Sequence, residues 1–428
     1  MSQFRLRQLS DAWAQWSHFL YDVELVELNA SLLSSTGVAP HVLNHTEEVI
    51  VRILHVPDTH FSKSSDMSPW SDRMHKAFAS PTDWETREHT STRRELLKAL
   101  KFAKTMDVDL IALGGDLVNF PSPESVNDVY QELAKLRTPF LYTAGNHDWH
   151  LEKLNGWETT FDAQMKPNEN GPLKKLYTAS GKGLKGELSD PRFGYVEVTD
   201  GLRVVCIDNS NFLIDSDQLH FFLQMMNSSE FLVLLMHIPI YFPGLTWGPS
   251  DVMGHPFWGA ATDQNAEVEE RQKWPLEAPQ LVRDFIQSVK TAAEKRQLLA
   301  ILTGHTHENG VVPVPCASTC DDSGVKQFTS RPNFGGGSRL LVLRMPNTAG
   351  TTTTAQAPKW QTPPPNRWML HVDLDLRLAA AALLVFGIFY FWRRSRLPCR
   401  TGNSPVSEPY MLGASEPKTW EEEQAAIC

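Results

Sequence analysis

The chain has 428 residues and a formal net charge of −10 at pH 7, with 41% hydrophobic and 21% charged residues. This length allows one large domain with attached segments, or two domains, and the composition is ordinary for a chain with a packed core. The negative charge argues against a nucleic-acid partner held by a broad basic surface, because such binding depends on neutralising phosphates.

Residues 1–48 precede the first predicted core strand, and the sequence does not indicate their role. The stretch from Leu20 to Leu33 alternates apolar and acidic residues and is typical of an amphipathic helix. Residues 1–35 contain no continuous apolar run of the kind that a secretory signal peptide has. Three asparagines stand in N-x-Ser/Thr triplets and are candidate glycosylation acceptors: Asn29, Asn44 and, further along, Asn227.

Five apolar runs typical of buried β-strands follow, and residue types that bind metal ions stand just after each run. The runs cover residues 49–56, 110–113, 139–143, 231–236 and 298–302. The polar groups after them are Asp58 with His60, Asp116, Asn146 with His147 and Asp148, His237, and His305 with His307.

Residues 93–106 and 126–136, which lie between these runs, carry apolar side chains at helical spacing. Strand–helix alternation predicts an α/β fold built in layers. Ligands of such sheets bind at the carboxyl ends of the strands, so the five polar groups are expected to meet on one rim.

The chemistry of these side chains fits a pair of divalent metal ions. Carboxylate and amide oxygens and neutral imidazole nitrogens are ligands for Zn²⁺, Mn²⁺ and Fe. Two ions roughly 3.5–4 Å apart can hold a phosphate oxygen and a bridging hydroxide for in-line attack on phosphorus. Such a pair needs a carboxylate between the ions, and Asp116 is the natural candidate. None of the groups contains cysteine, which argues against a structural zinc site.

The blocks D-x-H, G-D, G-N-H-D, a single His and G-H-x-H, in this order, resemble the calcineurin-like metallophosphoesterase family over residues 49–345. The resemblance implies a layered β-sandwich flanked by helices and two divalent ions, which could be Mn, Zn, Fe or Mg. It also implies which side chains hold the ions. Asp58, His60 and His307 would hold one ion, Asn146, His237 and His305 the other, with Asp116 bridging.

The same resemblance gives His147 the role of a general acid that protonates the leaving-group oxygen, with Asp148 orienting it. A histidine beside a carboxylate is also a good general acid near neutral pH on chemical grounds. Asn119 stands where the family often has another acidic residue. Asn119 and His150 are therefore candidates for residues that contact the metal ligands without binding the ions themselves.

These features predict a metal-dependent phosphoester hydrolase. Phosphomonoesters fit this chemistry, and so do phosphodiesters, including membrane-linked or glycolipid ones. A non-catalytic interaction module on the same fold is the alternative from another functional class. Such modules typically lose ligands or the acid histidine, whereas all seven predicted ligands and His147 are present in this chain.

Two features lie within the predicted domain but outside the five blocks. The stretch 244–279 is rich in glycine, proline and tryptophan, including Trp247, Trp258 and Trp274. A loop of this length is often functional, so it is either a lid over the rim or a surface excursion packed by its own aromatic residues. Cys316 and Cys320 are close enough in sequence to form a small disulfide.

The composition changes after residue 345. Residues 346–373 are rich in Thr and Pro and predict a linker. Residues 374–392 form an apolar stretch that ends in aromatic residues and predicts one transmembrane helix, ahead of a polar tail at 393–428. Cys399 in that tail is a candidate for palmitoylation.

The basic cluster Arg393, Arg394 and Arg396 indicates the orientation of this single-pass membrane protein. The positive-inside rule places the arginines in the cytosol and the catalytic domain in a lumen or outside the cell. A tail-anchored protein with a cytosolic catalytic domain is the alternative. The sequence indicates no oligomeric state.

Overall fold

The structure is a computed structural model. It describes residues 22–29, 49–63, 92–149, 151–153, 156–158, 173–245, 252–254, 279–318 and 323–345. The chain divides into two units, Met1–Thr351 and Thr352–Cys428, and every described residue belongs to the first.

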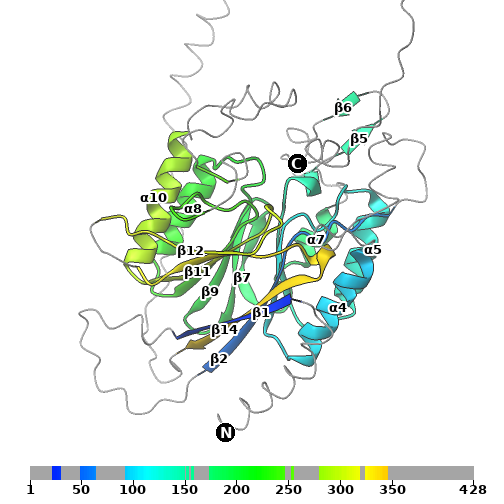
Figure 1. Ribbon diagram of the computed structural model, residues 1–428, viewed down its shortest axis with the longest axis horizontal. Coiled ribbons are helices and arrows are strands. Elements are labelled where there is room, and N and C mark those ends of the chain that lie inside the picture. The colour runs from blue at the N-terminus through cyan, green and yellow to red at the C-terminus, as the bar shows by residue number, and fades with distance from the viewer. Residues whose placement is uncertain are drawn as a thin grey trace, which may run out of the picture. The chain divides into compact units, whose positions relative to one another are not determined.

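Two β-sheets form the centre of this unit (Figure 1). The first sheet has the order β1 (Asp22–Asn29), β14 (Gly337–Met345), β2 (Val49–Val56), β3 (Leu110–Gly114), β4 (Phe140–Thr143). The second has the order β12 (Gly310–Pro313), β13 (Lys326–Thr329), β11 (Leu298–Thr303), β10 (Phe231–Leu235), β9 (Leu202–Ile207), β8 (Phe193–Thr199), β7 (Lys185–Asp190). A separate hairpin pairs β5 (Leu151–Lys153) with β6 (Gly156–Glu158).

The five strands predicted from the apolar runs are present as β2, β3, β4, β10 and β11. Within the first sheet, β2, β3 and β4 are parallel, and within the second, β9, β10 and β11 are parallel. Their carboxyl ends therefore lie at the same edge of each sheet, which is where the predicted ligands follow.

The two sheets pack face to face. One hydrophobic cluster joins residues of the first sheet, such as Ile53 and Ala112, to residues of the second, such as Val233 and Leu302, all fully buried. Each large aliphatic side chain buried in this way contributes about 1.5–3 kcal/mol to folding. Both faces of these central strands are buried, which explains why their sequences are continuous apolar runs.

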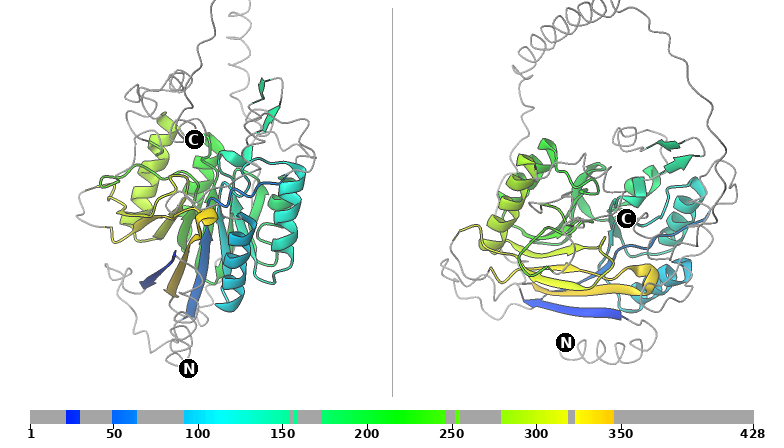
Figure 2. Two further views of the ribbon diagram at one scale, coloured as in Figure 1. Left: turned by 45° about the vertical axis from the view of Figure 1, so that its right-hand side comes forward. Right: turned by 45° about the horizontal axis from the view of Figure 1, so that its top comes forward.

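Helices cover the outer face of each sheet (Figures 1 and 2). On the first sheet lie α4 (Thr92–Thr105), α5 (Pro123–Ala134) and α7 (Lys174–Ala179), and on the second lie α8 (Ser216–Met226) and α10 (Gln280–Glu294). Short 3₁₀ turns are η1 (His147–Trp149) and η3 (Asn333–Gly335). The predicted layered α/β fold, a β-sandwich between helices, is therefore confirmed.

Local sequence explains where the helices begin. Ser122 caps α5 by accepting the backbone N–H of Ser125, and Pro123 stands at the first helical position. Asp215 and Gln218 form a capping box at the start of α8.

The prediction of an amphipathic helix at residues 20–33 is wrong, because residues 22–29 form strand β1. This strand pairs in parallel with β14, from Asp22 opposite Gly337 to Asn29 opposite Arg344. The sequence D-V-E-L-V-E-L-N fits a two-residue period nearly as well as a helical one, and the edge of β14 supplies hydrogen-bond partners for a strand. The first sheet therefore begins before residue 49.

Several predicted features lie outside the described residues: His150, Asn44, Cys320, Cys399, the three tryptophans of the stretch 244–279, and everything after residue 345. Within the described part of the chain, no helix combines the length and the apolar character that a membrane span requires. Cys316 is disulfide-bonded. Asn227 is exposed at the end of α8.

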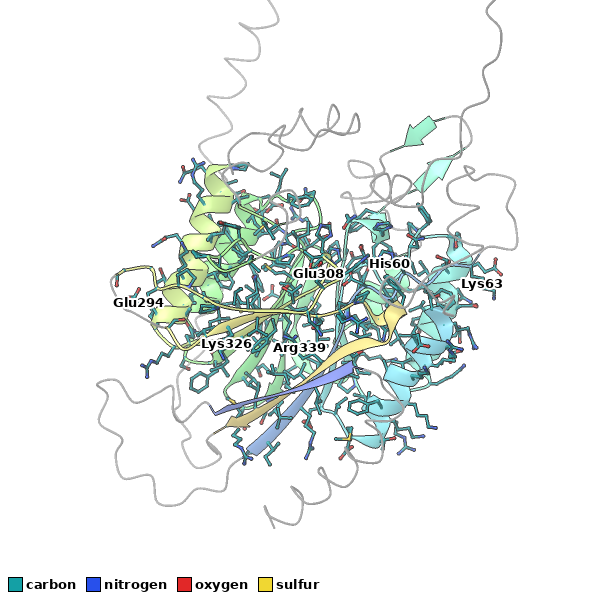
Figure 3. All side chains as sticks on the ribbon, in the orientation of Figure 1. His60, Lys63, Glu294, Glu308, Lys326 and Arg339 are labelled. Atoms are coloured by element: carbon teal, nitrogen blue, oxygen red, sulfur yellow. The ribbon has the colours of Figure 1, made fainter. Side chains whose placement is uncertain are left out.

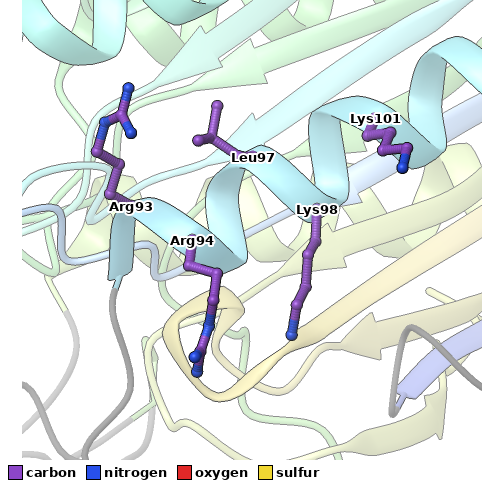
Figure 4. A pocket seen from close by; sticks show the side chains of 5 residues that line it. All are labelled: Arg93, Arg94, Leu97, Lys98 and Lys101. Atoms are coloured by element: carbon purple, nitrogen blue, oxygen red, sulfur yellow. The ribbon is translucent and has the colours of Figure 1, made fainter.

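A shallow hollow of about 390 Å³ lies along α4, lined by Arg93, Arg94, Leu97, Lys98 and Lys101 (Figure 4). Arg93 pairs with Glu132, and Arg94 and Lys98 both pair with Glu95, so acidic neighbours partly neutralise this basic face. None of the predicted ligands lines the hollow.

A fully buried histidine lies beneath the rim in the first sheet. His55 of β2 stands opposite the buried Arg339 of β14, and its Nδ1 lies 3.0 Å from Ser330 Oγ. Burial, and next the charge of Arg339, lower the pKa of His55 from 6.5 to about 3. The histidine therefore stays neutral in the folded protein at pH values where it gains a proton in the unfolded chain.

We predict that His55→Asn makes unfolding less dependent on pH. Between pH 6.5 and 3 the unfolded chain binds the extra proton, so the stability due to a neutral His55 is complete above pH 6.5 and is lost as the pH falls. The variant should reduce the slope of the free energy of unfolding against pH by up to about 1.4 kcal/mol per pH unit. Denaturant unfolding at several pH values measures this, with the exposed His220→Gln as control. An unchanged slope in His55→Asn would contradict the assignment.

Candidate metal centre

The predicted ligands meet at the carboxyl ends of the parallel strands. Figure 3 shows His60 and Glu308 at this end of the two sheets. His60 follows β2, and Glu308 stands in the segment after β11 that also contains His305 and His307. Three groups of acidic and histidine residues could hold a metal ion. Within each group, every residue offers one ligand atom, and these atoms all lie within 4.8 Å of one another. These groups are Asp58, His60 and His307; Asp116, His237 and His305; and His60, Asp116 and His147.

Unusual backbone conformations aim several of these side chains. Among the described residues, eight that are not glycine have positive φ, and five of these are predicted ligands. Their φ values are 48° at Asp58, 45° at His60, 48° at Asp116, 70° at His305 and 58° at His307. Each such conformation costs about 1–3 kcal/mol and persists only where the surroundings enforce it. Strain concentrated on these five residues marks the rim as the functional part of the fold.

The first ligand group joins the ends of β2 and β11. His307 Nε2 lies 3.2 Å from His60 Nε2 and 3.6 Å from Asp58 Oδ1. The buried Asp58 carboxylate also accepts the backbone N–H of His305, at 3.0 Å from either oxygen. Phe334 of η3 packs edge-on against the rings of His60 and His307, with centroids 5.3 and 5.2 Å away. The predicted set for one ion is thus assembled.

The second ligand group joins the ends of β4, β10 and β11. Asn146 Oδ1 lies 3.1 Å from His237 Nε2 and 3.1 Å from His305 Nδ1. His237 is fully buried, and its other ring nitrogen, Nδ1, lies 2.9 Å from the carbonyl oxygen of Gly114. A carbonyl accepts, so Nδ1 donates its proton to Gly114. Burial alone would lower the pKa of His237, but the charge of Asp116 raises it to about 10, so Nε2 also carries a proton, which a metal ion bound there would replace.

Asp116 lies between the two groups. Its Oδ2 is 3.6 Å from His60 Nε2 and 3.2 Å from His237 Nε2. Its Oδ1 accepts the backbone N–H of His147 at 2.8 Å. Burial alone would raise the pKa of Asp116, but the neighbouring imidazoles, His237 foremost, hold it well below its usual range. One carboxylate oxygen therefore faces a histidine of each group, as the predicted bridging role requires.

The spacing of the donor atoms fits metal ions. Donors bound to one ion at about 2.0–2.2 Å stand roughly 2.8–3.6 Å apart, from octahedral to tetrahedral geometry, and the separations given above run from 3.1 to 3.6 Å. Burial lowers the pKa of His60 and lowers that of His305 to about 3, so both histidines stay in the neutral form that binds metal. The facing nitrogens of His60 and His307 would share a cation favourably, because each offers a lone pair.

His147 lies at the edge of the centre, on η1. It is buried, and its ring packs edge-on against that of His60 with centroids 4.6 Å apart. His147 Nδ1 lies 3.2 Å from the carbonyl oxygen of Asn119, which accepts a hydrogen bond from it. Nε2 is then the nitrogen that can exchange a proton with a bound substrate, as the predicted general acid needs.

Asp148 does not make the predicted contact with His147 through its described hydrogen bonds. Its two oxygens accept the backbone N–H groups of Val118 and Gly145, both at 2.9 Å. Burial, and next the charge of Asp116, raise the pKa of Asp148 to about 7. Asp148 thus ties the loop after β4 to the loop after β3, and the Asn119 carbonyl accepts the hydrogen bond of His147 Nδ1.

Asn119 has the supporting position that was predicted for it. Besides offering its carbonyl to His147, it places its side-chain Oδ1 3.4 Å from His60 Nδ1. Asn119 therefore contacts two histidines of the centre.

Two glycines at the centre leave room for carboxylates. A Cβ at Gly145 would stand 2.2 Å from Asp116 Oδ1, and one at Gly304 would stand 2.2 Å from Asp58 Oδ2. Since side chains essentially never approach this closely, these two positions require glycine for space rather than for backbone conformation.

We predict that Gly145→Ala displaces Asp116 and weakens metal binding by about 10- to 100-fold, the range found when a ligand loses its support. Titration with Mn²⁺ measures the effect. Gly201→Ala is the control: Gly201 has φ +82° and open space around it, so alanine there adds backbone strain of about 1–2 kcal/mol without a collision. Equal metal affinity in both variants would contradict the close approach at Gly145.

One segment near the centre lies outside the predicted ligand pattern. Asp208 and Asn209 follow the apolar strand β9; Asn209 binds the backbone of His237, and Asp208 binds Trp149. Their sequence signal, an apolar run that ends in polar residues, is the same as in the five predicted blocks. The ligand pattern does not indicate this segment, because neither residue belongs to it.

Comparisons with known proteins agree with this architecture. A family model for calcineurin-like phosphoesterases matches residues 51–309, which is more than half of the chain. No curated protein matches the chain in sequence.

Three similar solved structures are a dimetal phosphatase from Danio rerio, a Staphylococcus aureus protein assigned as a 5′-nucleotidase and crystallised with alpha-ketoglutarate, and PhoD. Sequence identities are 10%, 13% and 10%, with TM-scores of 0.37, 0.35 and 0.38. The matches cover 67%, 69% and 67% of this chain and 88%, 51% and 57% of the other chains, so this chain spans about half of the last two.

These structural likenesses are distant, and the assignment rests on the family match over residues 51–309. The clustered aspartates and histidines of the rim could bind metal ions, as a phosphoesterase of this type requires. The chain belongs to the calcineurin-like phosphoesterases and is a phosphoester hydrolase.

Proposed function

We propose that the protein hydrolyses a phosphoester at a centre of two divalent metal ions, one held by Asp58, His60 and His307 and the other by Asn146, His237 and His305. The single observation that carries this proposal is the position of Asp116 Oδ2 between His60 Nε2 and His237 Nε2. Bound there, two ions would polarise the phosphoryl oxygens and make water acidic enough to attack phosphorus at neutral pH.

The protein side chains position the substrate and move the proton. His60, His237 and the other buried donors converge on the rim, so a phosphate oxygen placed there would meet the positive charge of the metal ions that these donors hold. His147 donates a proton from Nε2 to the departing oxygen, while its Nδ1–H stays bound to the Asn119 carbonyl. The carbonyl keeps the ring in this tautomer and orientation.

The substrate class is tested with two chromogenic esters. The purified protein is assayed on p-nitrophenyl phosphate and bis-p-nitrophenyl phosphate, with Mn²⁺, with Zn²⁺ and with a chelator. We expect hydrolysis that depends on metal, and the preferred ester distinguishes a monoesterase from a diesterase that acts on membrane-linked or glycolipid substrates. Hydrolysis that persists unchanged after metal removal would exclude the proposed chemistry.

We also propose that residues 374–392 anchor the protein in a membrane and that the catalytic domain lies in a lumen or outside the cell. The disulfide at Cys316 supports an oxidising compartment, and the exposed Asn227 is accessible to glycosylation. Treating the cell-expressed protein with an N-glycosidase tests this placement. A mobility shift that Asn227→Gln reduces supports it, and protease accessibility of the catalytic domain from the cytosol would place the domain on the other side.

A further inference from the structure

Three residues in the loop after β9 contact His237, His305 and the turn that follows Asn146. We call Asp208, Asn209 and Phe212 the β9 clamp. Asn209 is fully buried and binds the backbone at His237, Asp208 binds Trp149 of the turn that follows Asn146, and Phe212 packs on His305. None of the three contributes to the three metal-compatible groups among the described residues.

Asn209 fixes the bend at which His237 leaves β10. Its side-chain Oδ1 accepts the backbone N–H groups of His237, at 3.1 Å, and Ile238, at 3.0 Å. Its Nδ2 donates to the carbonyl of Ile238 at 2.8 Å. These partners are fully buried, so water cannot replace the asparagine. Removing the side chain would leave two buried N–H groups without their acceptor.

Asp208 holds the turn that carries the general acid. Its Oδ2 accepts the indole N–H of Trp149 at 3.2 Å, and both side chains are only 6% exposed. Trp149 ends η1, and its backbone N–H donates to the carbonyl of Asn146 at 3.3 Å. Asn146 and His147 lie in the turn that follows β4 of the first sheet, and Asp208 follows β9 of the second. The Asp208–Trp149 hydrogen bond therefore connects the ends of these two strands.

Phe212 completes the set through an aromatic contact. Its ring meets the ring of His305 edge-on, with centroids 5.6 Å apart. The backbone of Phe212 has φ 60°, and its N–H donates to the carbonyl of Asn209 at 2.8 Å, closing a turn that links these two clamp residues.

The clamp is itself anchored to α8. Gln218, in the capping box of that helix, donates its side-chain N–H to the carbonyl of Asp208 at 2.6 Å. Ser210 donates both its backbone N–H and its hydroxyl to Asp208 Oδ1, at 2.9 and 2.5 Å. A helix cap and a tight turn thus hold Asp208 and Asn209 rigidly relative to the second sheet.

We propose that the β9 clamp is a positioning device that acts selectively on the second metal site, through Asn209 and Phe212, and on the general-acid turn, through Asp208. This inference rests on the proposed two-metal function. The first site, Asp58 with His60 and His307, is held by other residues, notably Phe334. Loss of the clamp should therefore weaken binding of the ion at the second site and leave the affinity of the first site unchanged.

The first experiment titrates the full-length purified protein with Mn²⁺ and counts bound ions per chain for wild type, Asn209→Ala and Phe212→Leu. We expect one ion to bind about 10- to 100-fold more weakly in Asn209→Ala, as happens when residues that orient ligands are lost, while the other ion keeps its affinity. Asn209→Asp retains the accepting oxygen but loses the donor to the Ile238 carbonyl, so it should recover only part of this loss. Phe212→Leu is the second test variant, and the same titration of it decides the question if Asn209→Ala does not fold.

Asn211→Ala is the matched control. Asn211 lies in the same loop, but its side chain accepts the backbone N–H of Leu213 at 3.0 Å on an exposed surface. We expect this variant to bind both ions as the wild type does. Selective weakening of one ion is a result that a general loss of stability would not produce.

The second experiment tests the Asp208 arm with Trp149→Phe, which removes the N–H donor and keeps an aromatic ring. Both ions should remain bound, while kcat on an alkyl phosphoester falls at least 10-fold more than kcat on a nitrophenyl ester, because only the alkyl leaving group needs a proton. Asp208→Asn keeps one accepting oxygen, which can serve either Trp149 or Ser210, so its effect should be smaller than that of Trp149→Phe but not absent.

The outcomes separate this inference from the proposed function. If the wild type binds two ions and neither Asn209→Ala nor Phe212→Leu changes either affinity, the clamp is not a positioning device. If Trp149→Phe lowers kcat equally on both esters, the link from Asp208 to His147 is wrong. A wild type that binds no metal overturns the two-metal proposal itself, and the clamp inference with it.

Discussion

Asp116→Asn should remove both bound metal ions and the activity together. The substitution keeps the shape of the side chain but takes away the charge of the oxygen that faces both His60 and His237. Losing a residue that merely supports a ligand costs about 10- to 100-fold, so the loss of a bridging ligand should exceed about 100-fold in metal affinity and in kcat/KM. Metal analysis of the purified variant and assays at several Mn²⁺ concentrations measure both effects.

Asp200→Asn provides the control for this substitution. Asp200 is exposed in the turn between β8 and β9, and its replacement changes the net charge by the same amount without touching the rim. We expect it to retain metals and turnover. If Asp116→Asn retains two ions per chain, Asp116 does not bridge them, and the proposed geometry of the centre is wrong.

His147→Gln should retain both metal ions and lose most turnover on substrates with alkoxide leaving groups. Proton donation by a positioned side chain typically contributes about 10²- to 10⁴-fold, and the expected fall in kcat is of that size. Nitrophenolate leaves without a proton, so the same variant should lose much less activity on nitrophenyl esters. Comparing kcat on an alkyl ester and a nitrophenyl ester measures the difference directly.

The metal content of His147→Gln distinguishes two roles for this residue. His147 also lies within ligand distance of His60 and Asp116, so it could in principle be a ligand rather than an acid. Loss of an ion from the variant would indicate a ligand. Full activity on the alkyl ester would refute both roles, whereas His220→Gln, on the exposed face of α8, should change neither measurement.

The sequence predicts most of the central architecture because each strand that carries a ligand is buried on both faces. The runs that form β3, β10 and β11 are continuous apolar stretches, and β2 is interrupted only by Arg52 and His55. Such stretches end where the chain reaches the rim. Parallel pairing then brings distant polar residues, such as Asp58 and His305, to the same edge. Residue type and order along the chain were therefore sufficient to assemble both ligand groups.

Other features depend on contacts that a sequence pattern does not contain. The segment of β1 fits a helical and a strand period almost equally, and only the edge of β14 decides between them. Asp148 neighbours His147 in sequence, yet the turn η1 directs its carboxylate to Val118 and Gly145. Asn209 binds His237 across 28 positions of the chain, and nothing local marks that pairing.

Metal content measured on the purified wild-type protein tests the central claim most directly. The account predicts two divalent ions per chain, both removed by a chelator together with the phosphoesterase activity, and both restored when Mn²⁺ or Zn²⁺ is added back. One ion per chain, or activity that survives complete removal of metal, would contradict a centre in which Asp116 joins two metal sites.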